Sequence, residues 1–214
     1  MTKYFYEETG MFIDWNQMDR LPEIDTLIDI GVGPNGTPDL YKKYHSQKLI
    51  LIDPLDESEN YAKENLKNRD YTFHKTALGK KQETQEIKVE RKIGRSTLLN
   101  VSDINYEGDP IDTRIIQVNK LDSIISSPQD LGRIGIKIDT EGFELNIIQG
   151  ASKTLEYSKF VLAEVRHNHE SFEGVYQLHQ FIDAMHQNGF ILSIIFTAKP
   201  FIADLCFEKR EELF

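Results

Sequence analysis

Four short runs of apolar residues, rich in Ile, Leu and Val, set the strongest limit on how this chain can fold. They occupy residues 26–30, 49–52, 134–138 and 160–165. Continuous apolar runs of this length are typical of strands that are buried on both faces of a sheet. Segments with apolar residues at helical spacing lie between them, so the pattern predicts parallel strands joined by crossover helices. A chain of 214 residues is long enough for one such α/β domain.

The helices expected between these runs carry their own sequence signals. Thr37 is expected to cap the first helix, and Asp56 with Glu59 resembles a capping box at the start of the second. Apolar residues at helical spacing predict one helix over residues 143–155 and another over residues 175–185. Alternation of polar and apolar residues indicates half-exposed strands in the middle of the chain, at residues 71–76, 86–90 and 114–119.

The C-terminal end differs from the rest because two apolar runs follow each other closely. Residues 190–196 and 203–207 are joined by a short turn that contains Pro200, with no room for a helix, so this pair must be antiparallel. The predicted fold is therefore a Rossmann-like, doubly wound α/β domain with a mostly parallel seven-stranded sheet that ends in an antiparallel hairpin. This is the sheet of the class I methyltransferase fold. We assign residues 25–214 to the domain and residues 1–24 to an N-terminal extension or lid.

A glycine-rich turn follows the first apolar run and opens the first helix. Residues 29–36 read Asp-Ile-Gly-Val-Gly-Pro-Asn-Gly. Glycines let the backbone turn tightly and approach a ligand, and the N-terminus of the following helix offers free N–H groups. Gly31, Gly33 and Gly36 also fit the dinucleotide fingerprint G-x-G-x-x-G. The glycines thus predict an adenosine-type cofactor without choosing between S-adenosylmethionine and NAD.

Two acidic residues bear on that choice. Asp53 ends the second apolar run, where its carboxylate can accept hydrogen bonds from both hydroxyls of a ribose, as an acid does in NAD enzymes too. Asp29 lies beside the turn, which suits a positively charged amino acid moiety and would repel a pyrophosphate. We therefore favour S-adenosylmethionine, with an NAD-dependent oxidoreductase and a non-catalytic adenosine-cofactor-binding protein as alternatives. The predicted set of cofactor-binding residues also includes Asn35, Ala77 and Ser96.

A second group of polar residues ends the third apolar run. The chain reads Lys-Ile-Asp-Thr-Glu-Gly-Phe-Glu over residues 137–144. Lys137 lies inside the run, and a buried lysine requires a carboxylate partner. Asp139 and Glu141 follow at the carboxyl end of the expected strand, where ligands bind in open α/β sheets. A purely structural interpretation also exists, with Asp139 or Thr140 capping a helix and Glu141 in its first turn.

This segment resembles the FkbM family of methyltransferases. The resemblance extends from the glycine turn through Asp53 and Pro54, the segments at 94–98 and 118–122, and Gly150-Ala151 to Glu164, and covers roughly residues 25–166. The chain departs from the family at Val32-Gly33, where Ala-Asn is usual, and at Asp53, where Glu is frequent.

The resemblance implies transfer of a methyl group from S-adenosylmethionine to an oxygen, commonly a hydroxyl of a sugar or secondary metabolite. By its position, Asp139 is the best candidate for a residue at the methionine end of the cofactor, with Glu141 and Glu164 next. Carboxylates near the methyl group can orient a hydroxyl or the sulfonium, so all three are candidate catalytic residues. The acceptor is then a small molecule or a carbohydrate.

Two histidines follow the fourth apolar run. His167 and His169 are candidates for a general base, because an imidazole can take up a proton at neutral pH. Either could also bind a divalent ion together with Asp139 and Glu164, although we predict no metal site. The alternative is that both are solvated loop residues.

Composition excludes several classes of protein. A net charge of −10 argues against a nucleic-acid partner, and the single cysteine, Cys206, excludes an internal disulfide and a multi-thiolate metal site. No apolar stretch approaches the length of a membrane span and the N-terminus has no signal-peptide pattern, so we expect a cytoplasmic protein with no membrane partner. A homo-oligomer remains open. The remaining question is whether the N-terminal aromatic and methionine side chains pack on the core or form a lid; these are Tyr4, Phe5, Tyr6, Met11, Phe12 and Trp15.

Overall fold

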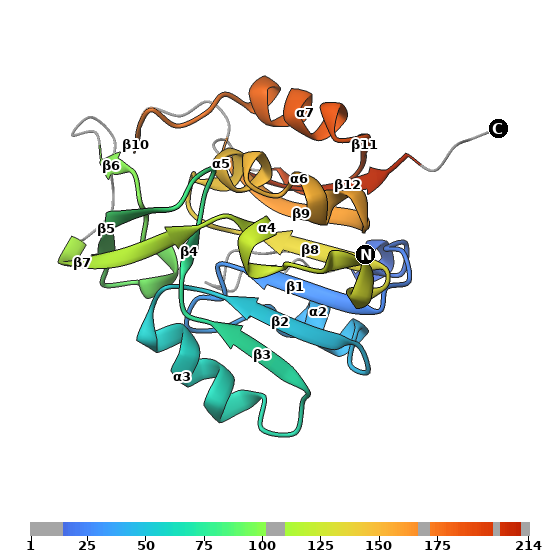
Figure 1. Cartoon of the computed structure of the whole chain (residues 1–214), viewed down its shortest axis with the longest axis horizontal. Helices are drawn as coiled ribbons and strands as arrows, with labels where there is room; N and C mark the ends of the chain where they lie inside the picture. The colour runs from blue at the N-terminus through green and yellow to red at the C-terminus, as the bar shows by residue number, and fades with distance from the viewer. Residues whose placement is uncertain (1–14, 102–109, 167–171, 199–201, 211–214) are drawn as a thin grey trace, which may run out of the picture.

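A seven-stranded sheet forms the centre of the computed structural model, which describes residues 15–101, 110–166, 172–198 and 202–210 (Figure 1). Its parallel strands include β1 (Thr26–Ile30), β2 (Lys48–Ile52), β3 (Tyr71–His74), β8 (Ile134–Ile138) and β9 (Ser158–Arg166). β12 (Ile202–Lys209) pairs antiparallel with both β9 and β11 (Phe190–Ala198). The order β11-β12-β9-β8-β1-β2-β3 confirms the predicted α/β fold with its C-terminal hairpin.

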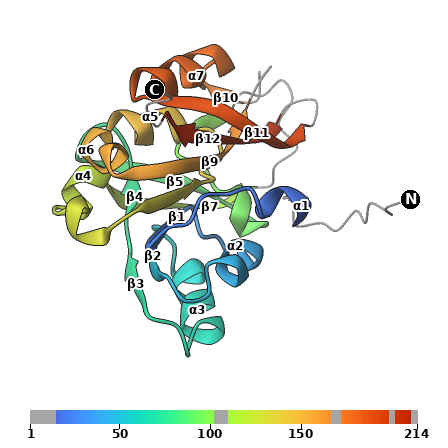
Figure 2. The ribbon, with the colours of Figure 1, turned by 90° about the vertical axis from the view of Figure 1, so that its right-hand side faces the viewer.

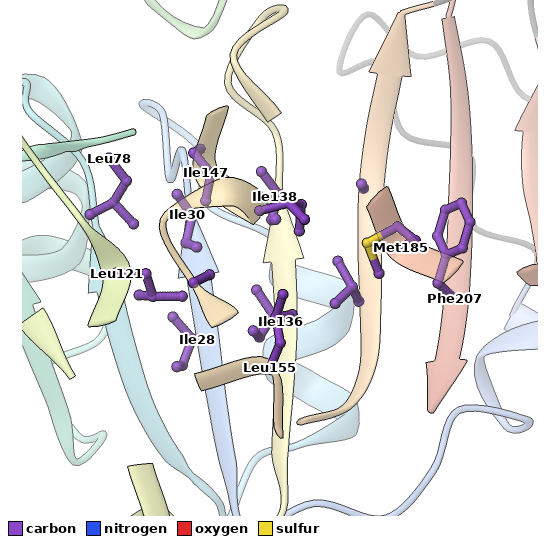
Figure 3. Packing of buried hydrophobic residues seen from close by; sticks show 14 of the residues in the cluster. Ile28, Ile30, Leu78, Leu121, Ile136, Ile138, Ile147, Leu155, Met185 and Phe207 are labelled. Atoms are coloured by element: carbon purple, nitrogen blue, oxygen red, sulfur yellow. The ribbon is translucent and has the colours of Figure 1, made fainter. Parts of the chain in front are cut away.

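The central strands separate two apolar cores, because alternate side chains of a strand point to opposite faces. Ile28 and Ile30 of β1 share one core with Ile136 and Ile138 of β8, and Leu27 belongs to the other. The first core is covered by α4 (Leu121–Ile124), α5 (Glu144–Gln149), α6 (Ser152–Glu156) and α7 (Leu178–Gln187) (Figure 3). The second is covered by α1 (Trp15–Met18), α2 (Pro38–Lys43) and α3 (Asp56–Asn65), on the other side of the sheet (Figure 2).

A second, smaller sheet stands at the end toward which the arrowheads of β1, β2 and β8 point (Figure 1). It has the order β4-β7-β5 and consists of β4 (Ala77–Leu78), β5 (Glu83–Glu90) and β7 (Pro110–Asn119). The short helix η1 (Ile93–Arg95) follows β5, and β6 (Asn100–Val101) pairs with β10 (Phe172–Glu173). Of the three segments predicted as half-exposed strands, only residues 71–74 join the main sheet, where they form its edge strand. The other two lie in β5 and β7 of the second sheet, which has its own small core.

The helix predicted over residues 143–155 is wrong as a single element. The structure has α5 and α6 instead, separated at Gly150. A Cβ atom at Gly150 would overlap the carbonyl oxygen of Gly79, so the chain passes close to the end of β4 at this point. The close approach of two backbones, which apolar spacing does not encode, interrupts the helix.

The predicted caps of the first two helices have different outcomes: Thr37 stands at the N-cap position of α2 with Pro38 next, as expected, whereas the cap predicted for α3 is wrong. Thr37 precedes α2 but makes no capping hydrogen bond, because its hydroxyl donates to the Asp29 carboxylate at 3.0 Å. Asp56 is the first residue of α3 rather than its cap, and Leu55 stands at the capping position without a side-chain bond. The helix expected over residues 175–185 is present as α7, which begins at Leu178 with a capping box.

The part of the expected N-terminal extension that the structure describes packs on the domain. Met18, Leu21 and Ile24 are buried in the core beneath α1 and α2. Residues 1–14, with most of the aromatic side chains of the expected lid, lie outside the described residues, as do His167, His169 and Pro200. Among the helices that are described, none combines the length and the apolar character needed to cross a membrane.

Candidate functional site

A cavity of about 1190 Å³ opens at the carboxyl ends of the parallel strands. Its wall includes the glycine turn after β1, the end of β2, the ends of β8 and β9, and the η1 segment of the second sheet. Four separate parts of the chain meet here because parallel strands bring all their carboxyl ends to one edge of a sheet. This is the edge at which the sequence predicted ligand binding.

The glycine turn fits tightly against the end of β8. Gly31 has a φ of 78°, which favours glycine, and a Cβ atom there would overlap the carbonyl oxygen of Asp139. Gly33 has a φ of 61°, and a Cβ atom there would meet the Cα atom of Gly94 in η1 at 3.7 Å, an ordinary contact distance. The turn therefore presents bare backbone to the cavity between the sheet and η1.

Asp53 is held in place by the backbone on both sides of it. Its carboxylate accepts hydrogen bonds from the N–H groups of Gly33, at 3.0 Å, and Leu55, at 2.9 Å. Burial raises the pKa of Asp53, and these two N–H groups oppose that rise. The carboxylate lines the cavity and keeps free lone pairs after these two hydrogen bonds. It can therefore accept further hydrogen bonds from ribose hydroxyls.

Asp29 lies behind the cavity wall rather than on it. Its carboxylate is fully buried and accepts hydrogen bonds from the hydroxyls of Thr37 and Tyr41. On the neighbouring strand, in register with Asp29, Lys137 places its ammonium 3.2 Å from the carboxylate. The expected partner of the buried lysine is thus Asp29, with Asp139 at 3.6 Å as a second.

Lys137 connects the strand ends to the glycine turn. Its ammonium donates a hydrogen bond to the carbonyl oxygen of Gly31 at 2.9 Å. Burial opposes its charge, but the carboxylates of Asp29 and Asp139 outweigh that effect and raise the pKa of Lys137. The lysine therefore stays charged and fixes the turn relative to β8.

Three acidic side chains converge on the cavity from the ends of β8 and β9. Oxygen atoms of Asp139, Glu141 and Glu164 lie within 4.8 Å of one another. Burial, together with the negative charges of Asp139, Asp204 and Glu144, raises the pKa of Glu164 well above its usual value. Such a cluster attracts a cation, either a positively charged ligand or a metal ion.

The loop that carries two of these acids is held by a buried glutamate. Glu144 accepts hydrogen bonds with Oε1 from the N–H groups of Thr140 and Gly142 and from the Thr140 hydroxyl, each at 3.0 Å. Its Oε2 accepts a bond from the Tyr176 hydroxyl at 2.8 Å. Glu141 within this loop has a φ of 54°, an unfavourable value outside glycine, which this network has to maintain.

Arg166 closes the loop from the other side. Its guanidinium forms an ion pair with the Glu141 carboxylate and stacks on the ring of Phe172. Burial and the nearby charge of Arg95 lower the pKa of Arg166 to about 10, although Asp139 acts in the opposite direction. The arginine is therefore still protonated at neutral pH and neutralises Glu141.

The remaining predicted site residues have different surroundings. Asn35, Ala77 and Ser96 line the cavity, and the hydroxyl of Ser96 accepts a hydrogen bond from the N–H group of Glu90 at 3.2 Å. Gly36 also lines it, but a Cβ atom there would collide with the rings of Tyr41 and Tyr61, so its first requirement is packing.

An adenosine cofactor with a positively charged sulfur fits these residues. Asp53 retains acceptor capacity, and the carboxyl groups of Asp139 and Glu164 lie near the strand ends, where they suit a positive charge.

Sequence reasoning assigned no role to Glu144, Arg166, Tyr176 or Arg95. Glu144 belongs to the segment 137–144, and Arg166 directly follows the apolar run 160–165. A charged residue next to a predicted buried strand was the signal that could have identified both. Tyr176 gives no such signal, because only the folded chain brings its hydroxyl to Glu144.

Comparison with known proteins gives a family match. A family model described as the methyltransferase FkbM domain matches residues 31–192. A search of curated proteins finds no match.

Solved structures share the fold at low sequence identity. A putative S-adenosylmethionine-dependent methyltransferase from Listeria monocytogenes has 11% identity and a TM-score of 0.52, over 92% of this chain and 98% of that one. An uncharacterised protein from Listeria monocytogenes serotype 4b has 8% identity and a TM-score of 0.50, over 92% and 66%. A ribosomal protein L11 methylase from Lactobacillus delbrueckii subsp. bulgaricus has 17% identity and a TM-score of 0.45, over 91% and 76%.

Proposed function

The chain belongs to the FkbM methyltransferase family and is therefore an S-adenosylmethionine-dependent methyltransferase, and we propose that it methylates a hydroxyl oxygen of a sugar, glycan or secondary metabolite. The family match decides between the two adenosine cofactors that the glycine turn left open. The observation that carries the proposal is the cluster of Asp139, Glu141 and Glu164 beside that turn, because it suits a sulfonium cation.

The cofactor supplies a methyl group that its positively charged sulfur already activates. The work left to the protein is to bind this group, to align the attacking oxygen with it and to remove one proton. Asp53 would bind the ribose hydroxyls, and the backbone at Gly31 and Gly33, which lines the cavity, would hold the cofactor beside the turn. Asp29 acts indirectly, because its ion pair with Lys137 fixes the turn.

Asp139 is our proposal for the residue that takes the proton. Its side chain is 30% exposed, whereas that of Glu141 is 11% exposed and paired with Arg166. Burial and the neighbouring acids raise the pKa of Glu164 well above its usual value. When bound, S-adenosylmethionine would supply the methyl group and keep the electrons of the broken carbon–sulfur bond on its sulfur. The Asp139 carboxylate would take the proton of the attacking hydroxyl.

Calorimetric titration tests the cofactor assignment. We expect S-adenosylhomocysteine to bind with a Kd of about 1–100 μM, an ordinary range for such ligands, and NAD to give no binding heat. Asp53→Ala should weaken binding at least about tenfold, since it removes a charged acceptor of hydrogen bonds. The matched control is Asp56→Ala, an exposed carboxylate outside the cavity wall. Equal loss in both variants would contradict the role of Asp53.

The transfer itself is tested with labelled methyl donor and a panel of nucleotide sugars, polysaccharides and phenolic or polyketide alcohols. Asp139→Asn should lower kcat by about 10²–10⁴-fold, the usual contribution of a general base. The affinity for S-adenosylhomocysteine should change much less, because the amide keeps the shape of the side chain. Unchanged kcat in this variant would exclude Asp139 as the proton acceptor.

A further inference from the structure

Basic side chains gather on one wall of the cavity although the chain as a whole carries a net charge of −10. Arg91, Lys92 and Arg95 all line the cavity, and all three are exposed to solvent. They belong to η1 and the residues directly before it, at the end of β5. We call these three residues the basic rim.

The backbone fixes the basic rim over the glycine turn. A Cβ atom at Gly94 would have the ring of Pro34 as its nearest neighbour, at 3.7 Å, so η1 lies directly against the turn. Just after η1, Thr97 exchanges backbone hydrogen bonds with Lys88, and its hydroxyl donates to the Glu141 carbonyl oxygen at 2.9 Å. The side chains of the rim thus start from a backbone that is tied to both the second sheet and the loop that carries the proposed catalytic acids.

Two cations of the rim are not neutralised by this chain. Within the described part of the chain, neither Lys92 nor Arg95 forms an ion pair or a side-chain hydrogen bond. The inner cations of the cavity differ in this respect, because Lys137 is paired with Asp29 and Arg166 with Glu141. Arg95 is close enough to Arg166 for its charge to act on it. Unpaired positive charges that lie near one another are relieved by a bound anion.

We propose that Lys92 and Arg95 bind a phosphate or carboxylate group of the methyl acceptor, so that the substrates of this enzyme are anionic derivatives of a sugar or metabolite. This inference rests on the proposed methyltransferase function and adds a substrate class to it. The acids at the strand ends and the cations of the rim then divide one cavity between two ligands of opposite charge: the sulfonium lies beside the acids, and the anion of the acceptor lies beside the rim.

The carboxylate of the cofactor is the competing source of negative charge. A single carboxylate needs one bidentate partner, whereas the rim has two cations, Lys92 and Arg95, without a partner in the described part of the chain. The side chains of Lys92 and Arg95 are also exposed to solvent, so an acceptor that enters from solvent can reach them. We therefore assign the rim to the acceptor and let the experiment separate the two sources.

The test titrates inorganic pyrophosphate into the protein saturated with S-adenosylhomocysteine, at pH 7.5 and low salt, with calorimetric detection. The variant is Lys92→Gln combined with Arg95→Gln. The matched control is Lys67→Gln combined with Lys153→Gln, which removes the same charge at exposed positions outside the cavity. We expect pyrophosphate to bind the wild type and the control equally, and the rim variant about tenfold or more weakly. The Kd for S-adenosylhomocysteine should be the same in all three proteins.

Three outcomes would overturn the inference. In the first outcome, pyrophosphate does not bind the wild-type complex. In the second, pyrophosphate binds the rim variant as tightly as it binds the control. In the third outcome the rim variant loses affinity for S-adenosylhomocysteine but not for 5′-methylthioadenosine, which lacks the amino acid portion; the rim would then serve the cofactor. Failure of the proposed function has a separate sign, because wild-type protein would then not bind S-adenosylhomocysteine at all.

Discussion

Glu164 shows how one buried carboxyl group can sense the charge of the cofactor. Its pKa is raised well above its usual value by burial and by the negative charges of neighbouring acids. A sulfonium beside it favours the ionised form, whereas the neutral sulfur of S-adenosylhomocysteine does not. Binding of the methyl donor should therefore release a proton that binding of the product does not release.

This release predicts a pH-dependent preference between the two ligands. The ratio of the affinities for S-adenosylmethionine and S-adenosylhomocysteine should increase as the pH rises from 6 to 8, by at most about tenfold per pH unit for one proton. Glu164→Gln should make the ratio independent of pH. Titrations of both ligands at several pH values give the ratio directly, and a flat profile in the wild type would refute the role of Glu164.

Glu144 controls the catalytic loop without touching the proposed substrate. It accepts four hydrogen bonds that fix Thr140 and Gly142 on one side and Tyr176 on the other. Glu144→Ala leaves these donors unpaired in a buried site, so we expect a loss of about 2–5 kcal/mol in the free energy of unfolding. Urea denaturation measures that loss, and Glu156→Ala, an exposed glutamate in α6, should change stability by less than about 0.5 kcal/mol.

The conservative change Glu144→Gln separates stability from positioning. The amide oxygen can still accept the three bonds at Oε1, but the NH₂ group cannot accept from the Tyr176 hydroxyl. We expect a folded enzyme with lower kcat and little change in the KM for the methyl donor. Wild-type kcat in this variant would show that Glu144 serves folding alone.

At the scale of elements, the break between α5 and α6 depends on one close contact. Gly150 lies against the carbonyl group of Gly79, so Gly150→Ala has to displace one of the two backbones. Overpacking of this kind costs about 1–3 kcal/mol, and each kilocalorie lowers the Tm of a chain of this size by about 2–4 °C. Differential scanning calorimetry tests the effect, with Gly94→Ala as the control because its Cβ atom meets nothing closer than 3.7 Å. Equal Tm values for the two variants would contradict the account.

Elements of the main sheet could be predicted from the sequence because their signals are local. The apolar runs at 26–30 and 134–138 coincide with β1 and β8, and the absence of room for a helix after residue 196 identified the hairpin. The second sheet could not be predicted in the same way. Alternation in β5 and β7 reveals one buried face but not which sheet a strand joins, and that depends on a long-range pairing.

The site could be predicted only as far as strand ends define it. Asp53, Asp139, Glu141 and Glu164 line one cavity, as expected for residues at the carboxyl edge of a parallel sheet. Asp29 was expected to contact the cofactor, but the alternation of side chains along β1 turns its carboxylate into the core beneath α2, where it pairs with Lys137. The sequence predicted that Lys137 needs a carboxylate partner. Only the register of β1 and β8 shows that this partner is Asp29.

For the whole molecule, buried carboxyl groups decide how stability depends on pH. Asp53, Glu144 and Glu164 all have pKa values that burial raises. In the unfolded chain these carboxyl groups lose their protons at a pH of about 4.5, whereas in the folded protein they lose them at a higher pH. The free energy of unfolding therefore falls as the pH rises from about 4.5 through the pKa values of the folded protein. Exposed acids act in the opposite direction: the ion pair with Arg133 lowers the pKa of Asp25 to about 2, and that contribution is lost only below a pH of about 4.

These opposed effects predict a maximum of stability in mildly acidic solution. We expect the highest Tm in mildly acidic solution, with a decline at higher pH as the buried acids ionise and a decline toward pH 3 as Asp25 and similar surface acids are protonated. The net charge of −10 at neutral pH works in the same direction, since self-repulsion weakens as the solution is acidified. Thermal denaturation of dilute protein across pH 3–9 measures the profile. Glu164→Gln removes one of the buried acids and should raise the Tm at pH 8 more than at pH 5, whereas a wild-type maximum at pH 8 would mean that the buried acids are ionised in the folded protein.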